Sequence, residues 1–565
     1  MGRSIGIGYQ DFETVRRDNC FYIDKTQFIQ EWWEERDIVT LITRPRRFGK
    51  TLTMSMVEKF FSVNYADGGE LFEGLKVWKY EKFRKLQGTY PVIFLSFADV
   101  KETTYQQVRK KMCSIIQAIY DQYRFLLEGE LLNKNEKQNF QMISADMEDY
   151  MASGALKALS GYLFRYYGKR VIILLDEYDT PMQEAYVNGY WKELVSFTRS
   201  MFNSAFKTNP YLERAIMTGI TRVSKESIFS DLNNLEVVTT TSEKYDGCFG
   251  FTEEEVFKAL DEYGLTGRKQ QVKDWYDGFT FGTRTDIYNP WSILNYLDKK
   301  QLGTYWANSS SNSLVGKLIR EGSKDLKASF ETLLQGESIT AEIDEQLVYD
   351  QLDEDEQAVW SLLLASGYLK VRHFRAYMSD YGEWKQEYEL QLTNFEVKTM
   401  FRNMVKKWFA SAASNYNDFI KALLVGDIRA MNSYMNKVAL TTFSYFDTGN
   451  HPSREEPERF YHGFVLGLMV ELADRYILTS NRESGFGRYD VMLEPRNHKN
   501  DAMILEFKVQ NPDDEKELSD TVEAALDQIE QKKYETMLIE KGIPRENIRK
   551  YGFAFSGKQV QIGGV

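Results

Sequence analysis

The sequence is poor in cysteine, proline and histidine. Its 565 residues include 3 cysteines, 10 prolines and 4 histidines. The cysteines, Cys20, Cys113 and Cys248, lie far apart in the chain, which excludes a dense disulfide framework or a cysteine metal cluster and favours a reducing compartment. The histidines are scattered, so no zinc-type spacing or Ser-His-Asp arrangement emerges.

Long apolar segments are also lacking. The longest wholly apolar runs are short, such as residues 171–175, far below the ~20 residues of a membrane-spanning helix. The N-terminal stretch "MGRSIGIGYQ" has no apolar secretion core, and Gly6 stands where a myristoylation signal carries Ser or Thr. We therefore expect a cytoplasmic protein without a membrane partner.

The net charge is −12, from 71 basic and 83 acidic residues. An acidic balance argues against a protein that coats nucleic acid non-specifically, although it permits an enzyme with a local basic cleft. The length predicts two to four domains, and 43% hydrophobic with 27% charged residues is typical of globular proteins.

The first part of the chain alternates between strand-like and helix-like segments. Such a pattern is typical of a mostly parallel sheet that is covered by helices on both faces. The predicted strands are "DIVTLIT" (37–43), "PVIFLSFA" (91–98), "RVIILLDE" (170–177) and "RAIMTGIT" (214–221). After Thr252 and Glu255, which predict a capping box, residues 250–330 are expected to be helical, with an aromatic loop at 275–282.

The segment "LITRPRRFGKTLTMSM" (41–56) resembles a phosphate-binding loop, G-x-x-x-x-G-K-[ST], that has lost its first glycine to Arg44. Such a loop turns backbone N–H groups toward phosphate oxygens, ahead of a helix N-terminus. Gly49 permits the close turn, Lys50 can reach the β- and γ-phosphates, and Thr51 can bind Mg²⁺. Arg46 and Arg47 can compensate for the lost glycine by adding positive charge where phosphates would sit. The alternative is a basic strand–helix turn that binds nothing.

A second motif supports the nucleotide hypothesis. The strand "VIILLDEYDTP" ends in Asp176 and Glu177, and ligands gather at the carboxyl ends of parallel strands. Asp176 can hold Mg²⁺ through water, and Glu177 can orient the attacking water. Thr218 and Arg222, at the end of the next strand, are candidates to sense the γ-phosphate and to neutralise charge. The alternative is a set of polar strand caps.

Near the C-terminus, "GRYDVMLEPRNHKNDAMILEFKV" (487–509) predicts a β-hairpin. Asp490 and Glu506 are equidistant from His498, so they should face each other across two antiparallel strands. Two opposed carboxylates call for a cation, and Lys508 lies on the same face as Glu506. This set can bind Mg²⁺ and hold a water for phosphodiester hydrolysis. The alternative is an amphipathic hairpin with a surface Lys–Glu pair.

Taken together, "RPRRFGKTLTMSM", "LLDEYDTP", "MTGITRVSKESIFSDLNNL", "WYDGFTFG" and "YNPWSIL" resemble the bacterial AAA-ATPase-like family, as does "YIDKTQFI" (22–29). In that family the loop normally reads Arg-Pro-Arg-Arg-Phe-Gly-Lys-Thr or Ser, and a nuclease-like domain follows. The resemblance implies the usual nucleotide roles for Lys50, Thr51, Asp176 and Glu177. The other predicted nucleotide-binding residues are Arg46, Arg47, Phe48, Gly49 and Thr218. It implies a PD-(D/E)XK core of Asp490, Glu506 and Lys508, supported by Glu458, Gln528 and Tyr534.

We therefore predict an α/β protein with four domains. They are an AAA-like P-loop ATPase domain (1–249), a helical lid (250–335), a winged-helix-like and helical region (336–450) and a restriction-endonuclease-like PD-(D/E)XK domain (451–565).

The predicted activity is ATP binding and hydrolysis coupled to a nuclease-like domain. Its cofactors would be ATP and Mg²⁺, with Mn²⁺ as an alternative at the nuclease-like site. Its partner would be nucleic acid, DNA in preference to RNA, and a homo-oligomer would let Arg222 serve a neighbouring copy. The rival hypotheses are a non-catalytic nucleotide switch that binds DNA or a protein, and a chaperone-like ATPase.

Overall fold

The computed structural model divides the chain into two compact units, Met1–Ser310 with Thr340–Val397, and Ser311–Ile339 with Lys398–Val565. The finer domain boundaries stay predictions. The structure describes residues 2–222, 228–229, 232–309, 313–344, 352, 355–408, 413–446, 456–484, 487–511, 515–556 and 559–565. Among these residues, no helix is both long enough and apolar enough to span a bilayer.

A five-stranded parallel sheet, with the order β2-β3-β4-β1-β5, forms the centre of the first unit. Its strands are β1 (Val39–Thr43), β2 (Val92–Ser96), β3 (Val171–Asp176), β4 (Leu212–Gly219) and β5 (Leu235–Val238). All residues of β1 and β3 are buried, as expected for apolar strands covered on both faces. The four predicted strands are confirmed, and β5 was missed.

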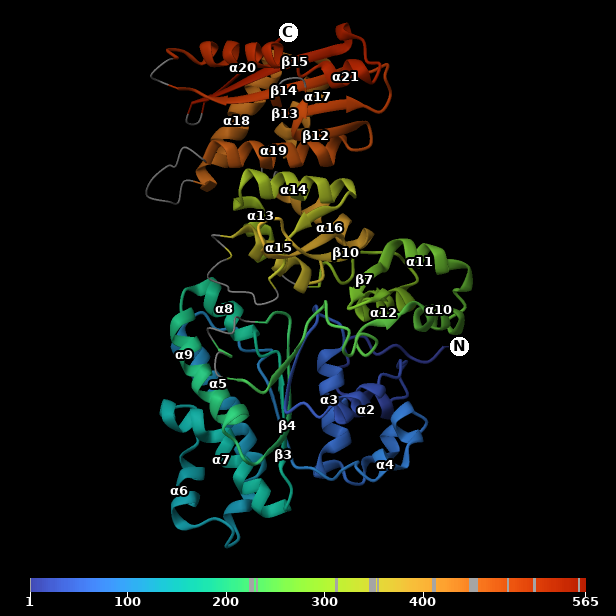
Figure 1. Ribbon diagram of the computed structural model, residues 1–565, viewed down its shortest axis with the longest axis vertical. Coiled ribbons are helices and arrows are strands. Elements are labelled where there is room, and N and C mark those ends of the chain that lie inside the picture. The colour runs from blue at the N-terminus through green and yellow to red at the C-terminus, as the bar shows by residue number, and fades with distance from the viewer. Residues whose placement is uncertain are drawn as a thin grey trace. The chain divides into compact units, whose positions relative to one another are not determined.

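Helices cover both faces of this sheet. In Figure 1, α2 (Gln27–Glu35) and α3 (Lys50–Phe61) lie on one side of β3 and β4. On the other side lie α5 (Tyr105–Gln122), α7 (Asp149–Tyr167) and α9 (Trp191–Phe202). The remaining helices of this part are α1 (Phe12–Arg17), α4 (Glu81–Arg84), α6 (Lys134–Met142) and α8 (Thr180–Asn188).

The segment after residue 250 is not wholly helical, so that prediction was wrong. Helices α10 (Glu253–Glu262), α11 (Lys269–Tyr276) and α12 (Pro290–Lys299) accompany a small sheet with the order β6-β8-β7. Its strands are β6 (Phe251–Thr252), β7 (Asp277–Phe281) and β8 (Arg284–Tyr288). The predicted aromatic loop is therefore largely strand, and its turn passes through Gly282, whose φ of 55° favours glycine.

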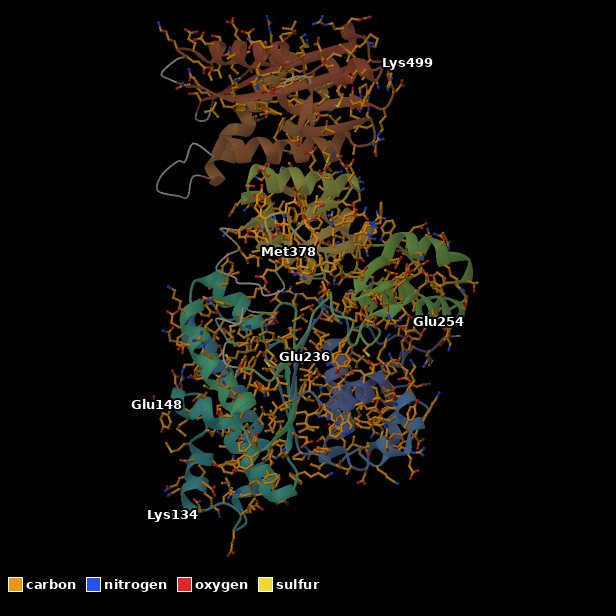
Figure 2. All side chains as sticks on the ribbon, in the orientation of Figure 1. Lys134, Glu148, Glu236, Glu254, Met378 and Lys499 are labelled. Carbon is orange, nitrogen blue, oxygen red and sulfur yellow. The ribbon has the colours of Figure 1, made fainter. Side chains whose placement is uncertain are left out.

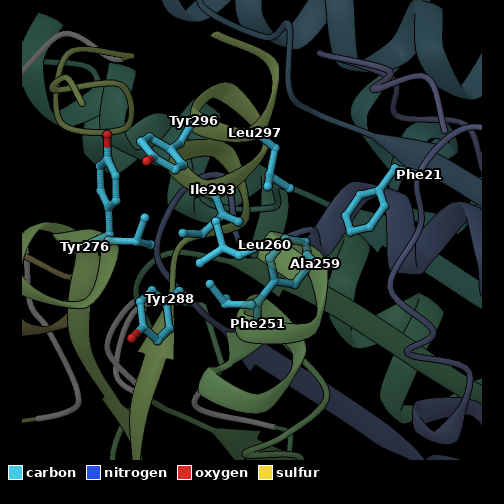
Figure 3. Close-up of a cluster of buried hydrophobic side chains, with 11 residues drawn as sticks. Phe21, Phe251, Ala259, Leu260, Tyr276, Tyr288, Ile293, Tyr296 and Leu297 are labelled. Atoms are coloured by element: carbon cyan, nitrogen blue, oxygen red, sulfur yellow. The ribbon is translucent and has the colours of Figure 1, made fainter. Parts of the chain in front are cut away.

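These helices and strands share one hydrophobic core. Figure 3 shows Tyr276, Tyr288 and Tyr296 gathered with Leu260 and Ile293. The predicted capping box at the start of α10 is confirmed, because the side chain of Thr252 accepts from the Glu255 amide and that of Glu255 accepts from the Thr252 amide.

A helix and a long hairpin complete the first unit, in the region where a winged-helix-like domain stays a prediction. They are α15 (Glu356–Ala365), β10 (Leu369–Met378) and β11 (Trp384–Leu392), with β9 (Ile339–Ala341) beside β11. The far end of the hairpin is exposed; Met378, labelled in Figure 2, is 62% exposed. Helix α16 (Phe395–Trp408) follows β11.

The C-terminal part is a second α/β layer, a sheet with the order β12-β13-β14-β15-β16. Its strands are β12 (Tyr476–Ser484), β13 (Gly487–Pro495), β14 (Ala502–Val509), β15 (Ile548–Ser556) and β16 (Gln559–Gly564). Helix α20 packs on β15 at Gly552, where an added Cβ would lie 2.8 Å from the Val522 carbonyl oxygen. The helices of this unit are α13 (Ser313–Glu321), α14 (Lys324–Gln335), α17 (Ala413–Val425), α18 (Ile428–Phe446), α19 (Glu456–Leu472), α20 (Leu518–Lys532) and α21 (Thr536–Glu540).

Candidate functional site

The turn between β1 and α3 contains two residues in the left-handed conformation. Gly49 has φ 81° and is the N-cap of α3, and Arg47 has φ 64°. A non-glycine residue at positive φ costs free energy, and such residues cluster at functional sites. Two left-handed residues thus turn the chain sharply ahead of α3, even though the first glycine of the loop pattern is replaced.

Arg44, the residue in place of that glycine, is fully buried. Its guanidinium donates to the carbonyl oxygens of Thr43 (3.1 Å), Thr239 and Lys244 (3.4 Å). It also lies 4.5 Å from the ring centroid of Phe281. Arg44 thus fastens the entry of the loop to the segment after β5 and to β7, so its role is to hold the backbone.

Lys50 is buried at the mouth of the loop. Its Nζ donates to the carbonyl oxygens of Arg44 (2.8 Å) and Pro45 (3.0 Å). Burial lowers the pKa of Lys50, whereas the carboxylates of Glu177 and Asp179 oppose that shift. The ammonium group is therefore held by loop carbonyls that a phosphate group would compete with.

Asp176 ends β3 and is hydrogen-bonded to both helix α3 and strand β4. The hydroxyl groups of Thr51 (2.8 Å) and Thr218 (2.5 Å) donate to its two carboxylate oxygens. Strand β4 lies between β1 and β3, so Asp176 is not on the strand adjacent to β1. Thr218 lies on the intervening strand β4, where it pairs with Ile42 of β1. Burial raises the pKa of Asp176, and the two hydrogen bonds oppose that shift.

Glu177 also adopts the left-handed conformation, with φ 51°. Its amide donates to Thr218 Oγ1 (3.2 Å), and Thr180 Oγ1 donates to its carboxylate (3.1 Å). Hydrogen bonds of both its backbone and its side chain thus hold Glu177 in this strained conformation.

The other predicted loop residues have protein partners. Arg46 donates to Gln183 Oε1 (2.9 Å), and the guanidinium of Arg47 lies 4.3 Å from the ring centroid of Trp291. Phe48 is 1% exposed and packs against Phe279, with ring centroids 4.8 Å apart. The side chain of Phe48 is a core residue, so only its backbone is placed to contact a ligand.

Arg222 lies apart from the Asp176 cluster. It lines a small cavity with Thr43 and Thr239, beside the ends of β1 and β5. Within the described part of the chain, its Nε atom is buried and has no hydrogen-bond partner. The structure therefore separates Thr218 from Arg222, which were predicted to act together. Thr218 is hydrogen-bonded to Asp176, whereas Arg222 is not in the described hydrogen-bond network of Asp176.

In the C-terminal sheet, the hairpin has the predicted register. Val491 pairs with Leu505, which places Asp490 opposite Glu506 one step further along. The Asp490 amide donates to Glu506 Oε2 (3.3 Å), and the Phe507 amide donates to Asp490 Oδ2 (2.8 Å). The two carboxylates therefore meet at one point of the sheet, and Glu506 is only 3% exposed.

The supporting residues are divided. Gln528 of α20 donates to Glu506 Oε1 and to the Tyr534 hydroxyl (3.2 Å), so both join the carboxylates. Lys508 follows Glu506 on β14 at the same-face position, half-buried. Glu458 lies in α19, but its side chain is outside the described residues.

Comparison with known proteins finds similarity in two regions of the chain. Residues 6–229 match the family model described as predicted AAA-ATPase, and residues 456–564 match the PD-(D/E)XK nuclease superfamily. The chain joins an AAA-ATPase-like region to a PD-(D/E)XK nuclease-like region. It is also 25% identical over 525 residues to an uncharacterized protein in the vnfD 5′ region of Azotobacter chroococcum mcd 1, covering 90% of this chain and 89% of that protein. The predicted resemblance and the α/β fold class are confirmed.

In the AAA-ATPase-like region, sequence reasoning missed Asp179. This buried carboxylate accepts from the amides of Ile220 (2.8 Å) and Thr221 (2.9 Å), and the Tyr178 hydroxyl donates to the Thr221 carbonyl (2.8 Å). Asp179 and Tyr178 thus fix the segment that leads from β4 to Arg222. The available signal was the last acidic residue of "DEYD", three positions after Asp176.

A second group that the sequence did not reveal lies between α10 and the small sheet. Carboxylate oxygens of Glu253, Asp277 and Asp286 lie within 4.8 Å of one another. Lys273 contacts Glu253 and lies 3.4 Å from Asp286. Burial, together with the neighbouring Asp286, raises the pKa of Asp277 to about 7. The ammonium group of Lys273 thus offsets part of the negative charge of this cluster.

Proposed function

We propose that the protein binds ATP with Mg²⁺ and hydrolyses it, and that this activity is coupled to a Mg²⁺-dependent nuclease-like domain acting on nucleic acid, DNA in preference to RNA. The observation that carries the proposal is the chain of hydrogen bonds from Thr51 through Asp176 to Thr218. It joins the phosphate-type loop to the strand that carries Glu177. The three free cysteines agree with a cytoplasmic setting.

The residues present suit a nucleotide and a hard cation. Backbone N–H groups of the loop and Lys50 would hold the phosphates. Thr51 and Asp176 offer the oxygen ligands that Mg²⁺ prefers. Burial raises the pKa of Asp176, and a bound cation would offset this effect by stabilising the charged carboxylate. Bound Mg²⁺ would neutralise charge on the phosphates, while Glu177 would orient water.

The nuclease-like site suits the same class of cation. Asp490 and Glu506 would hold Mg²⁺ or Mn²⁺, which would supply an activated water and charge neutralisation at a phosphodiester. Gln528 would keep Glu506 in position, and Lys508 would stabilise the developing negative charge.

The test follows phosphate release and nucleic-acid cleavage together, with ATP, Mg²⁺ or Mn²⁺ and several nucleic acids. Lys50→Ala should weaken ATP binding by about 10-fold or more, because it removes a charged donor to the phosphates. Glu177→Gln should keep binding and lose about 100-fold or more in hydrolysis, because it spares Asp176. Unchanged ATP affinity in Lys50→Ala would contradict the proposal.

A non-catalytic nucleotide switch is the second candidate. It is favoured by the hydrogen bond from Thr180 to Glu177, which engages the carboxylate that hydrolysis would require. Thr180→Ala separates the two: an ATPase should gain or keep its rate when Glu177 is released, whereas a switch should show no turnover in either protein. Mixing Lys50→Ala and Arg222→Ala chains tests whether Arg222 serves a neighbouring copy, because only then would the mixture regain activity.

A further inference from the structure

Two side chains that lie far from the loop in the sequence, but in the same unit, donate hydrogen bonds to one of its carbonyl groups. Trp306 Nε1 donates to the Arg46 carbonyl oxygen at 2.9 Å, and Asn289 Nδ2 donates to the same oxygen at 3.4 Å. Both donors are almost fully buried, with 4% and 1% exposed. We call Asn289 and Trp306 the brace.

The brace fixes the orientation of a peptide group. The described chain has no cis peptide bonds, so the Arg46–Arg47 peptide is trans. In a trans peptide the C=O and the following N–H point in opposite directions. With the Arg46 carbonyl held toward the brace, the Arg47 N–H is turned to the opposite side of the loop. Arg47 is also one of the two left-handed residues there, the conformation that makes successive N–H groups converge on an anion.

Asn289 is held in one orientation by its other contacts. Its Oδ1 accepts from the amides of Trp291 (2.9 Å) and Ser292 (3.3 Å) at the start of α12. Because the oxygen is used by this cap, the amide nitrogen must face Arg46. In addition, the Trp291 ring lies under the Arg47 guanidinium. The start of α12 therefore contacts both Arg46 and Arg47.

Trp306 is held as firmly. Its backbone amide donates to Glu396 Oε1 at 2.7 Å, and Glu396 is fully buried. Its ring packs edge-on against Phe279 and near Tyr368, with centroids 5.2 and 5.6 Å away. Phe279 in turn packs on Phe48 of the loop. The indole N–H is thus preset toward the Arg46 carbonyl before any ligand arrives.

We propose that Asn289 and Trp306 are positioning residues of the nucleotide site, which hold the Arg46–Arg47 peptide so that its N–H is presented to the phosphates. This inference rests on the proposed ATP binding. It explains how a loop without its first glycine keeps an anion-binding shape: the fixed path that glycine would allow is imposed from outside by two hydrogen bonds.

The test uses substitutions that remove each donor and keep the rest of the side chain's role. Trp306→Phe keeps an aromatic ring and removes the N–H. Asn289→Ser keeps an oxygen that can cap α12 and removes the amide. The matched control is Trp275→Phe in the same region, because Trp275 Nε1 is buried with no hydrogen-bond partner among the described residues.

Calorimetric titration with ADP and with inorganic pyrophosphate measures the effect, and melting temperatures report on folding. Each single substitution should weaken both ligands by about 3- to 10-fold and the double substitution by about 10- to 100-fold. Trp275→Phe should leave both affinities unchanged. The losses of affinity for pyrophosphate and for ADP should be equal, because the Arg47 N–H contacts a phosphate group that both ligands carry. A general loss of packing would not produce equal losses.

Two results would overturn the inference, and they are distinguishable. If the wild-type protein binds both ligands and the double variant binds pyrophosphate equally well, the brace is wrong and the proposed function stands. If the wild-type protein binds neither ligand, the proposed function fails and the brace fails with it.

Discussion

At the scale of single residues, Arg44 shows how a charged side chain can replace a glycine. The fully buried guanidinium donates to three carbonyl groups and stacks on Phe281. A buried charge is stable only when such partners satisfy it. Arg44, which departs from the expected loop sequence, therefore anchors the loop to the segment after β5 and to β7.

Arg44→Gly makes this interpretation testable, because it restores the general loop pattern. We expect it to weaken nucleotide binding and to lower the free energy of unfolding by about 3 to 5 kcal/mol, since three buried carbonyl groups lose their donor. Urea unfolding and ATP titration measure the two effects. The control is Arg36→Gly, at an exposed residue with φ 63°, which should be neutral or stabilising. Tighter ATP binding in Arg44→Gly would refute the fastening role.

Glu396 predicts a pH dependence. Burial raises its pKa from 4.5 to about 7 in the folded protein. The folded state then binds more protons than the unfolded state between these values, so this group's contribution is complete below pH 4.5 and is lost as the pH rises through about 7. The loss amounts to about 3 kcal/mol.

Glu396→Gln should remove this slope, because the amide keeps an oxygen for the Trp306 amide and can donate to Ser292 in place of accepting. Urea unfolding of both proteins from about pH 5 to 8 measures the difference. Parallel curves for the two proteins would show that Glu396 does not titrate in this range.

At the scale of elements, the C-terminal hairpin was predictable from spacing and the N-terminal sheet order was not. Eight residues on either side of His498 determine that Asp490 faces Glu506, because an antiparallel register follows from the turn. By contrast, β4 lies between β1 and β3 although it follows both in the chain, and the packing of helices decides that order. The hydrogen bond from Thr218 to Asp176 therefore could not be predicted from the spacing of residues alone.

The small β7–β8 hairpin was missed for a related reason. Its strands have five residues each, and the burial of β7 does not alternate, so its aromatic residues carried no strand period. Gly278 has φ 137°, and an added Cβ there would lie 1.9 Å from the Thr393 carbonyl oxygen, so the position requires glycine. That constraint comes from a residue more than a hundred positions away and is invisible locally.

The facing carboxylates of the hairpin predict a trade-off between stability and metal binding. Glu506→Gln should abolish the binding of Mg²⁺ and Mn²⁺, and it should leave the stability unchanged or raise it by up to about 1 kcal/mol because it removes like-charge repulsion. Calorimetric Mn²⁺ titration and thermal unfolding of the full chain measure both.

The matched control is Glu494→Gln on β13, the strand of the hairpin that carries Asp490. Glu494 pairs with Lys541 at 2.5 Å, away from Asp490, so its substitution should lower the stability slightly and keep metal binding. Full Mn²⁺ binding by Glu506→Gln would mean that the carboxylate pair is structural.

At the scale of the whole molecule, one chain joins an AAA-ATPase-like region to a nuclease-like region, and the proposed function assigns a phosphate-binding site to each. The AAA-ATPase-like region presents Lys50, Thr51 and Asp176, and the nuclease-like region presents Asp490 and Glu506. If the two sites are coupled, ATP must bind two conformations with different affinity, and the effect must be reciprocal. Coupling is the central claim of the proposed function.

Nucleotide affinity in the presence and absence of DNA tests that claim most directly. The protein is Glu177→Gln, which should bind ATP without consuming it, titrated at low salt alone, with single-stranded DNA and with duplex DNA at saturation. The account predicts that DNA shifts the ATP affinity by about 5- to 100-fold, and that ATP shifts the DNA affinity by the same factor. The same ATP affinity in all three titrations would contradict the account and would leave two independent modules on one chain.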